Sequence, residues 1–383
     1  MIVFPRKSRQ WRLLEIRPFG LALALSMGMA TAQAATEKAV PAPVPAPARV
    51  AITSPRPAPL PPAQIKALVN IEGDIGRGTG FVAKMHGRFF IVTNEHVLSG
   101  EKKLTITGMD GTKYPADGAL YGAKDYDVAI LQIPDNLAKY YLEIDQDPQT
   151  DTKAGEAVTV AGNADGIGVP AQAHGTLVGI GPDKVEVTAQ FVHGNSGSPI
   201  IYRPTGQVIG IATEVETVNS LTIAGGALYE STSHWLGYRL DNIPQDSGWV
   251  KLDWKRLAEE GVKVLQLDEA EEFLICLLSG KLLIPRSPEL VAAVGAYRTK
   301  MGQANEQQSL KFAESAFLDL INQTYDLASG EAKQLAGQKL YPYHLNRIQE
   351  IRDDLQHLKK YVDDANKDPA AYVRALNNRT DSN

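Results

Sequence analysis

The sequence predicts a mostly β body followed by an all-α region, and two observations support this prediction. Between about residues 65 and 246, short segments rich in β-branched and aromatic residues are separated by Gly, Asp, Asn or Pro, as strands are by turns. No helical stretch long enough to alternate with them occurs there, so we expect an antiparallel sandwich or barrel and not a parallel α/β sheet. From about Gly248 onward, apolar residues recur with helical spacing and glycines end the segments.

The individual elements follow from the same patterns. In chain order, the predicted strands lie in GTGFVAKM, RFFIVTNEHV, KLTITGM, DVAILQI, AVTVAG, GTLVGIG, KVEVTAQFV, QVIGIATEV and GALYE. The predicted helices lie in LDWKRLAEEG, LDEAEEFLICLLSG, SPELVAAVGAYRTKMG, SLKFAESAFLDLINQTYDLASG and YHLNRIQEIRDDLQHLKKYVDD. The last of these carries one apolar stripe on a charged helix, which favours packing against neighbouring helices over a long coiled coil.

Length and composition restrict the possible classes of protein. A chain of 383 residues is long enough for two or three domains. A net charge of −5 argues against a general electrostatic attraction to nucleic acid or to an anionic membrane. The single cysteine, Cys276, excludes an intramolecular disulfide. It lies in the apolar run EEFLICLLSG, which fits a buried core residue, with a reactive thiol as the alternative.

The N-terminus is predicted to direct export. Residues 1–34 combine a basic leader, the short apolar run GLALALSMGMATAQA and a small-residue cleavage site ending at Ala34. The run is too short and too rich in small residues for a comfortable membrane span. We therefore expect a cleaved signal peptide and a periplasmic or secreted protein, with an uncleaved, membrane-anchoring signal as the alternative. Residues 35–64 alternate Pro and Ala, so they are expected to form a semi-rigid linker.

The β body contains one candidate for each part of a serine hydrolase site. Such a site needs a hydroxyl nucleophile, a base oriented by a carboxylate, and backbone N–H donors for the oxyanion. His96 ends the strand-like FFIVTNEHV, Asp127 opens DVAILQI, and Ser196 lies in GNSGSP. Gly194 permits the unusual backbone that aims two N–H groups at one point. Taken alone, GNSGSP is an ordinary turn sequence.

Three segments together resemble those of trypsin-like serine proteases of the double β-barrel type. GTGFVAKMHGRFFIVTNEHVL resembles the family's Gly-x-Gly-Phe strand and the TNxHV segment after it. YDVAIL resembles the acid-bearing segment, and GNSGSPI resembles the nucleophile loop. The order His, Asp, Ser and the gaps of 31 (127 − 96) and 69 (196 − 127) residues also fit. Within the superfamily, the chain is most similar to bacterial periplasmic proteases of the HtrA/Deg kind and to glutamyl endopeptidases.

The resemblance covers about residues 65–247 and implies a fold and a site. The fold would be two antiparallel six-stranded β-barrels, followed by a helical C-terminal domain at residues 248–383. The catalytic residues would be His96 as base, Asp127 as orienting acid and Ser196 as nucleophile. The oxyanion hole would use the N–H groups of Gly194 and Ser196, and Thr213 would lie near the triad carboxylate. The substrate pocket would be lined by Gln190, His193, Glu214, Gly225 and Gly226.

The sequence also departs from its relatives. Ser198 stands where many of them have glycine, as it does in glutamyl endopeptidases. The position of the substrate-binding histidine of those enzymes is here Ala212 or Thr213, which argues against cleavage after glutamate. HtrA proteases carry PDZ domains after the protease, but the helical region shows no carboxylate-binding loop of the PDZ type. Of the other histidines, His86, His344 and His357 are expected to face solvent.

Competing motifs are excluded by their context. GNSGS lacks the final glycine and the strand–helix flanks of an α/β-hydrolase elbow. GRGTGF is followed by a strand and not by the helix of a dinucleotide-binding loop. No HExxH or Cys/His spacing occurs, so we expect no catalytic metal and no cofactor.

Two function hypotheses follow. The first is an exported serine endopeptidase acting on proteins or peptides through an acyl-enzyme. The second is a catalytically silent, protease-like binding or sensor module with a helical docking domain. The C-terminal helices offer surface for a protein partner or for self-association, and no nucleic acid is expected as a partner.

Overall fold

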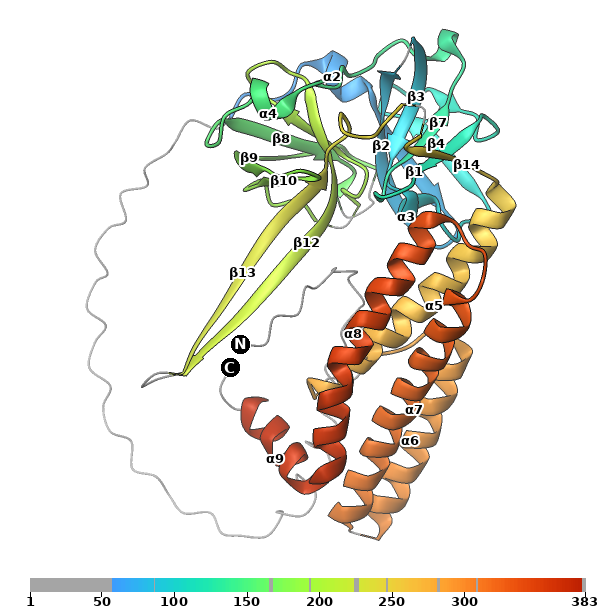
Figure 1. Ribbon diagram of the computed structural model, residues 1–383, viewed down its shortest axis with the longest axis vertical. Helices are drawn as coiled ribbons and strands as arrows, with labels where there is room; N and C mark the ends of the chain where they lie inside the picture. The colour runs from blue at the N-terminus through green and yellow to red at the C-terminus, as the bar shows by residue number, and fades with distance from the viewer. Residues whose placement is uncertain are drawn as a thin grey trace, which may run out of the picture.

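The structure is a computed structural model, and it describes residues 57–85, 87–164, 168–192, 194–223, 227–245, 247–280, 283–307 and 309–380. The predicted signal peptide and most of the predicted linker lie outside the described residues. Figure 1 shows a β-rich body, from which a long hairpin projects, and a bundle of long helices beside it. The predicted order of a mostly β body and a helical C-terminal region is confirmed.

The first half of the β body is an eight-stranded antiparallel sheet in the order β14-β6-β7-β3-β2-β1-β4-β5. Central strands such as β3 are covered on both faces, because four of its residues in succession are buried. The strands are β1 Leu68–Gly73, β2 Arg77–Met85, β3 Arg88–Thr93, β4 Leu104–Gly108, β5 Lys113–Tyr114, β6 Leu120–Ala123, β7 Ala129–Gln132 and β14 Trp249–Leu252. Short helices connect or precede strands of the body: α2 Pro62–Lys66, α3 Glu95–Leu98, η1 Asp135–Leu137 and α4 Pro148–Asp151.

This sheet differs from the expected six-stranded barrel, and strand β14 is one reason. The prediction assigned Trp249–Leu252 to the helical region, but these residues pair with β6, from Trp249 opposite Ala123 to Leu252 opposite Leu120. An unpaired edge of β6 would leave backbone N–H and C=O groups without partners. The first four residues after Gly248 therefore complete the sheet, and the helical region begins at α5.

The second half of the β body is a closed barrel of six strands in the order β10-β13-β12-β11-β8-β9, as the resemblance implied. Its interior is lined by buried aliphatic and aromatic side chains, among them Val160, Ile200 and Tyr202. The strands are β8 Ala157–Gly162, β9 Ala171–Ile180, β10 Lys184–Val187, β11 Pro199–Tyr202, β12 Val208–Ile223 and β13 Ala227–Tyr238. A further apolar core, containing Phe81 and Ile211, joins the sheet to the barrel.

The projecting hairpin in Figure 1 is the extension of β12 and β13 beyond this barrel. The two strands pair from Ile211 opposite Tyr238 to Ile223 opposite Ala227, with one shift of register between Ala212 and Glu214. Strand β10 pairs with β13 only between Trp235 and Tyr238, so the rest of the hairpin is a two-stranded ribbon in the described part of the chain. The sequence predicted two shorter strands here, because polar residues interrupt the β-branched run.

The helical region consists of α5 Trp254–Leu278, α6 Pro288–Glu306, α7 Leu310–Ala336, α8 Pro342–Lys367 and α9 Pro369–Thr380. Helix α5 begins where the Asp253 side chain accepts a hydrogen bond from the Arg256 N–H at 2.9 Å, a typical N-cap. The predicted apolar stripe of α8 is buried in a core that also contains Cys276. None of the described helices is long and apolar enough to span a membrane.

Candidate active site

His96 lies on α3, a single helical turn directly after the buried strand β3. Residue 94 is the extended N-cap of this turn, but its side chain does not cap it. Instead the Asn94 amide donates to the Asp127 carbonyl oxygen at 2.6 Å and to the Thr213 hydroxyl at 2.9 Å. The start of α3 is therefore fixed to the segment that leads into β7 and to β12 of the barrel.

The His96 imidazole is oriented by both oxygens of the Asp127 carboxylate. Asp127 Oδ2 lies 2.5 Å from His96 Nδ1, and Asp127 Oδ1 accepts the backbone N–H of His96 at 2.9 Å. An ionised carboxylate only accepts hydrogen bonds, so Nδ1 carries the proton and Nε2 of the neutral ring can accept one. The two side chains are 20% and 11% exposed, which leaves the ring accessible and the carboxylate sheltered.

Ser196 lies in a tight loop between the barrel strands β10 and β11. Gly194 and Gly197 both have φ of +85°, a left-handed conformation that favours glycine. The buried Asn195 closes the loop, since its N–H donates to the Val192 carbonyl at 3.0 Å and its side-chain oxygen accepts the Val192 N–H at 3.1 Å. Ser196 itself is partly exposed.

Thr79 on β2 holds this loop against the first sheet. Its N–H donates to the Ser196 carbonyl at 2.9 Å, and its hydroxyl donates to the Gly194 carbonyl at 2.6 Å. The same hydroxyl accepts the Asn163 N–H at 2.8 Å. Thr79 was missed by the sequence analysis as a site residue. The signal was its place between the two glycines of the Gly-x-Gly-Phe motif.

The Ser196 loop and α3 both pack against strand β2. A Cβ atom added to Gly78 would lie 2.6 Å from Val97 Cγ1 and 3.3 Å from the Ser196 carbonyl oxygen. A Cβ atom at Gly197 would lie 2.0 Å from the Thr79 carbonyl oxygen. The two glycines therefore permit a close approach that brings the candidate nucleophile to the turn bearing the candidate base.

The backbone N–H groups of the loop fall into two sets. Those of Asn195, Gly197 and Ser198 donate to backbone carbonyls of Val192, Ala212 and Asn195. Within the described residues, those of Gly194 and Ser196 make no such bond. An oxyanion hole requires backbone donors that are not already used in the fold, and these two N–H groups meet that condition.

The two serines of the loop differ in accessibility. Ser198 is 0% exposed, and a Cβ atom at Gly162 would lie 1.9 Å from its Oγ. Its hydroxyl has no hydrogen-bond partner in the described part of the chain. Ser198 therefore fills a buried space behind the loop, whereas Ser196 reaches the surface.

Glu95, beside His96, is a buried acid that the sequence analysis did not identify. It is 1% exposed, and a Cβ atom at Gly122 would lie 2.2 Å from its Oε2, so glycine makes room for the carboxyl group. Burial raises the pKa of Glu95 well above 4.5, and the nearby Asp127 and Glu260 carboxylates raise it further. Burial therefore favours the protonated, uncharged form of the Glu95 carboxyl group beside the His96–Asp127 pair.

The predicted pocket residues are only partly described. His193, Gly225 and Gly226 lie outside the described residues. Gln190 is exposed between β10 and the Ser196 loop, and Glu214 lies on β12 at a bulge. The register sets Leu236 opposite Glu214, while Ile223 and Ala227 pair at the far end of the hairpin.

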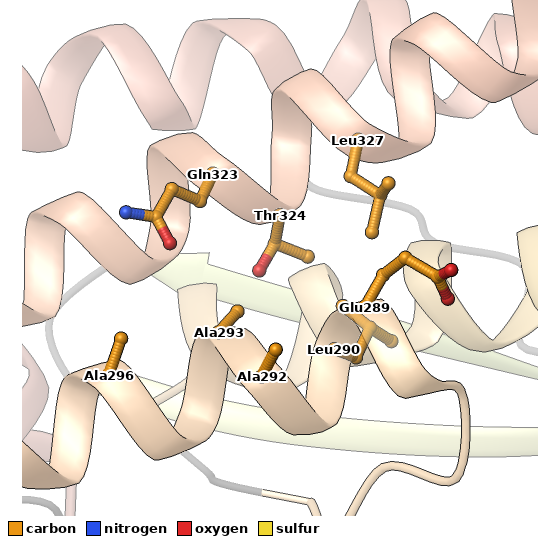
Figure 2. A pocket seen from close by; sticks show the side chains of 8 residues that line it. All are labelled: Glu289, Leu290, Ala292, Ala293, Ala296, Gln323, Thr324 and Leu327. Carbon is orange, nitrogen blue, oxygen red and sulfur yellow. The ribbon is translucent and has the colours of Figure 1, made fainter.

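Other cavities and clusters lie apart from these residues. A groove runs between α6 and α7 (Figure 2), and none of its lining residues belongs to the sheet or the barrel. Among the described residues, no group of three His, Cys, Asp or Glu side chains could hold a metal ion.

Comparison with known proteins agrees with this geometry. Residues 78–211, which contain His96, Asp127 and Ser196, match the model of the trypsin-like peptidase domain. This segment is a trypsin-like peptidase domain. It runs from β2 into β12 and therefore contains the junction at which α3 and the Ser196 loop meet.

Curated relatives of the peptidase domain are proteases of the HtrA/Deg type. A probable periplasmic serine endoprotease, DegP-like, of Rhizobium meliloti is 28% identical over 211 residues, which are 52% of this chain and 40% of the relative. Serine protease HTRA4 of the mouse is 27% identical over 257 residues, which are 64% of this chain and 49% of the relative. The chain thus spans about half the length, or less, of the curated relatives it matches.

Solved structures similar to the chain include proteases of the same kind. Rv3671c protease of M. tuberculosis, in an inactive form, is 25% identical and covers 45% of this chain and 84% of its own, with a TM-score of 0.33. The HtrA-type protease AlgW is 19% identical and covers 46% of this chain and 57% of its own, with a TM-score of 0.35.

Proposed function

We propose that the chain is an exported serine endopeptidase that hydrolyses peptide bonds through an acyl-enzyme. The observation that carries the proposal is the His96–Asp127 pair, 2.5 Å between Nδ1 and Oδ2, on a turn packed against the same strand as the Ser196 loop. The peptidase domain and its periplasmic DegP-like relatives support both the activity and the export. The predicted signal peptide at residues 1–34 is consistent with a periplasmic or secreted protein.

In the proposed reaction, Ser196 Oγ attacks the carbonyl carbon of the scissile peptide bond while His96 Nε2 takes its proton. Asp127 holds the ring in the required tautomer and stabilises the imidazolium. The N–H groups of Gly194 and Ser196 receive the oxyanion. The imidazolium then gives its proton to the leaving amine, and a water molecule, deprotonated by His96, hydrolyses the ester. General base assistance contributes about 10²–10⁴ in rate, and one oxyanion donor about 10²–10³.

A fluorophosphonate probe with mass-spectrometric site mapping tests the proposal directly. We expect labelling at Ser196 in the wild type, none in Ser196→Ala, and loss of nearly all turnover in that variant. The alternative, a silent binding module, has no need for the oriented His96–Asp127 pair and is not favoured. It would gain support from a folded wild-type protein that neither reacts with the probe nor cleaves any peptide of a library.

A further inference from the structure

The turn that carries His96 is shared between the peptidase domain and the helical region. Directly after α3, the Ser99 hydroxyl lies 2.7 Å from His344 Nε2 of α8. Ser99 is 5% exposed and His344 is 0% exposed, so the expectation that His344 faces solvent is wrong. The contact joins residues that are 245 positions apart in the chain.

His344 is in turn held by Glu260 of α5. Its Nδ1 lies 2.9 Å from Glu260 Oε2, which also accepts the Tyr341 N–H at 2.8 Å. Glu260 Oε1 accepts from Arg256 Nε at 2.5 Å. Burial alone would raise the pKa of Glu260, but the bonds from His344, the Tyr341 N–H and Arg256 together lower it. Glu260 is therefore ionised and accepts a hydrogen bond from His344 Nδ1, while His344 Nε2 is hydrogen-bonded to the Ser99 hydroxyl.

The order carboxylate, imidazole, hydroxyl is the one that activates a serine in hydrolases. Here it cannot serve that purpose, because no substrate reaches groups that are 0% to 5% exposed. What Ser99, His344 and Glu260 form is a buried polar relay across the contact between the two regions. A relay whose members are all paired fixes geometry, while a relay with one member removed leaves buried polar groups unsatisfied.

The backbones of the two regions also touch directly beside the relay. A Cβ atom at Gly261 of α5 would lie 2.2 Å from the Gly100 nitrogen and 2.2 Å from Ser99 Oγ. The Gly100 N–H points at the Leu257 carbonyl at 3.4 Å. Glycine inside a helix costs about 1 kcal/mol relative to alanine. The close approach of α5 to the Ser99–Gly100 backbone offsets that cost.

Helix α3 cannot fix its own position. It has four residues, far fewer than an isolated helix needs for stability. One end is fixed within the peptidase domain, through Asn94 and the bond from the His96 N–H to Asp127. The other end is fixed by Ser99 and Gly100, which contact the helical region. The direction of the His96 ring therefore depends on both ends.

We propose that the helical region is a built-in support of the general base, and that Ser99, Glu260, Gly261 and His344 are positioning residues for His96. The proposal rests on the proposed function, since it assumes that His96 acts as the base of a peptidase. In this role, α5 and α8 hold α3 at the distance and angle that proton transfer from Ser196 to His96 requires.

The test compares Gly261→Ala with Gly330→Ala in the full chain. Gly330 is an exposed helix-interior glycine of α7, and a Cβ atom there has nothing within 4 Å. In Gly261→Ala, the added Cβ atom must move from 2.2 Å toward the 3.4 Å of ordinary contact with the Gly100 nitrogen, so the two backbones must shift apart. A displacement on the order of 1 Å can cost about 10² in rate. We expect kcat and the rate of fluorophosphonate labelling to fall by about 10²-fold in Gly261→Ala, with KM little changed, and to stay at the wild-type value in Gly330→Ala.

A double-mutant cycle on the relay provides the second measurement. Ser99→Ala and His344→Ala are each expected to lower kcat, and the double variant to be no slower than His344→Ala alone, because the two residues act as a unit. His357→Ala, an exposed histidine of the same helix, is the matched control. Circular dichroism establishes that each variant is folded. If Gly261→Ala does not fold, Ser99→Ala, which loses only one hydroxyl, decides the matter.

Two negative results are distinguishable. Folded Ser99→Ala and His344→Ala proteins with wild-type kcat and labelling, in a wild type that is active, overturn the support role and leave the proposed peptidase intact. A wild type that neither cleaves nor reacts with the probe overturns the proposed function itself, and the support role with it.

Discussion

Replacing Asp127 by asparagine tests the site with a minimal change in shape. The backbone N–H of His96 donates to Asp127 Oδ1 at 2.9 Å, so the asparagine oxygen is expected at that position. The amide nitrogen then takes the place of Oδ2, 2.5 Å from His96 Nδ1. There it donates to Nδ1 and drives the ring proton to Nε2, which can no longer accept the proton of Ser196. In the reversed orientation, the NH2 group of the new amide would face the backbone N–H of His96. Two donors would then oppose each other, at a cost of about 1–3 kcal/mol.

The expected loss is large because the wrong tautomer removes the base entirely. We expect kcat to fall by about 10⁴ in Asp127→Asn, or about 5.5 kcal/mol in the activation barrier, with KM little changed. Asp125→Asn, two residues earlier and exposed, is the control and should behave as wild type. The assay is steady-state cleavage of a peptide substrate, with thermal unfolding to show that both variants fold. A folded Asp127→Asn enzyme with kcat within tenfold of wild type would refute the assignment of the acid.

Three further predictions concern the loop and its buried neighbour. Ser198→Ala should keep activity and stability, because it removes a buried hydroxyl without a partner among the described residues; a loss of turnover like that of Ser196→Ala would contradict this. Gly111→Ala should lose about 1–2 kcal/mol of unfolding free energy from its φ of +85° alone. Gly197→Ala, with the same φ and a Cβ contact at 2.0 Å, should lose about 1–3 kcal/mol more and its activity, as denaturant titration and cleavage assays would reveal. Because the pKa of Glu95 is raised in the folded state, the contribution of Glu95 to the free energy of unfolding falls as pH rises above 4.5, by about 1.4 kcal/mol per pH unit until the folded-state pKa is reached. Glu95→Gln should remove this slope, and parallel stability–pH curves for the two proteins would contradict the burial argument.

Much of the peptidase domain could be predicted because its determinants are local. The strands next to His96 and Asp127 are largely apolar runs, and Gly194 and Gly197 mark turns of positive φ. Strand β14 could not be predicted, since WVKL gains its stability only by pairing with β6, more than 120 residues earlier in the sequence. Thr79 was missed for a similar reason, because the hydrogen-bond partners of its N–H and hydroxyl groups come from distant segments of the chain.

The buried polar residues were the hardest to predict, and two of them, Glu260 and His344, join the two regions. Glu95, Glu260 and His344 are charged or ionisable residue types, which are almost never fully buried unless paired. Their environments follow from glycines that leave space or permit close approach, Gly122 for the Glu95 carboxyl group and Gly261 for the Ser99 backbone. A glycine on a helix or strand carries no sign of its partner in the sequence. These glycines and acids lie around the turn that carries His96. The contacts that are hardest to predict from the sequence are therefore the ones through which the helical region acts on the peptidase domain.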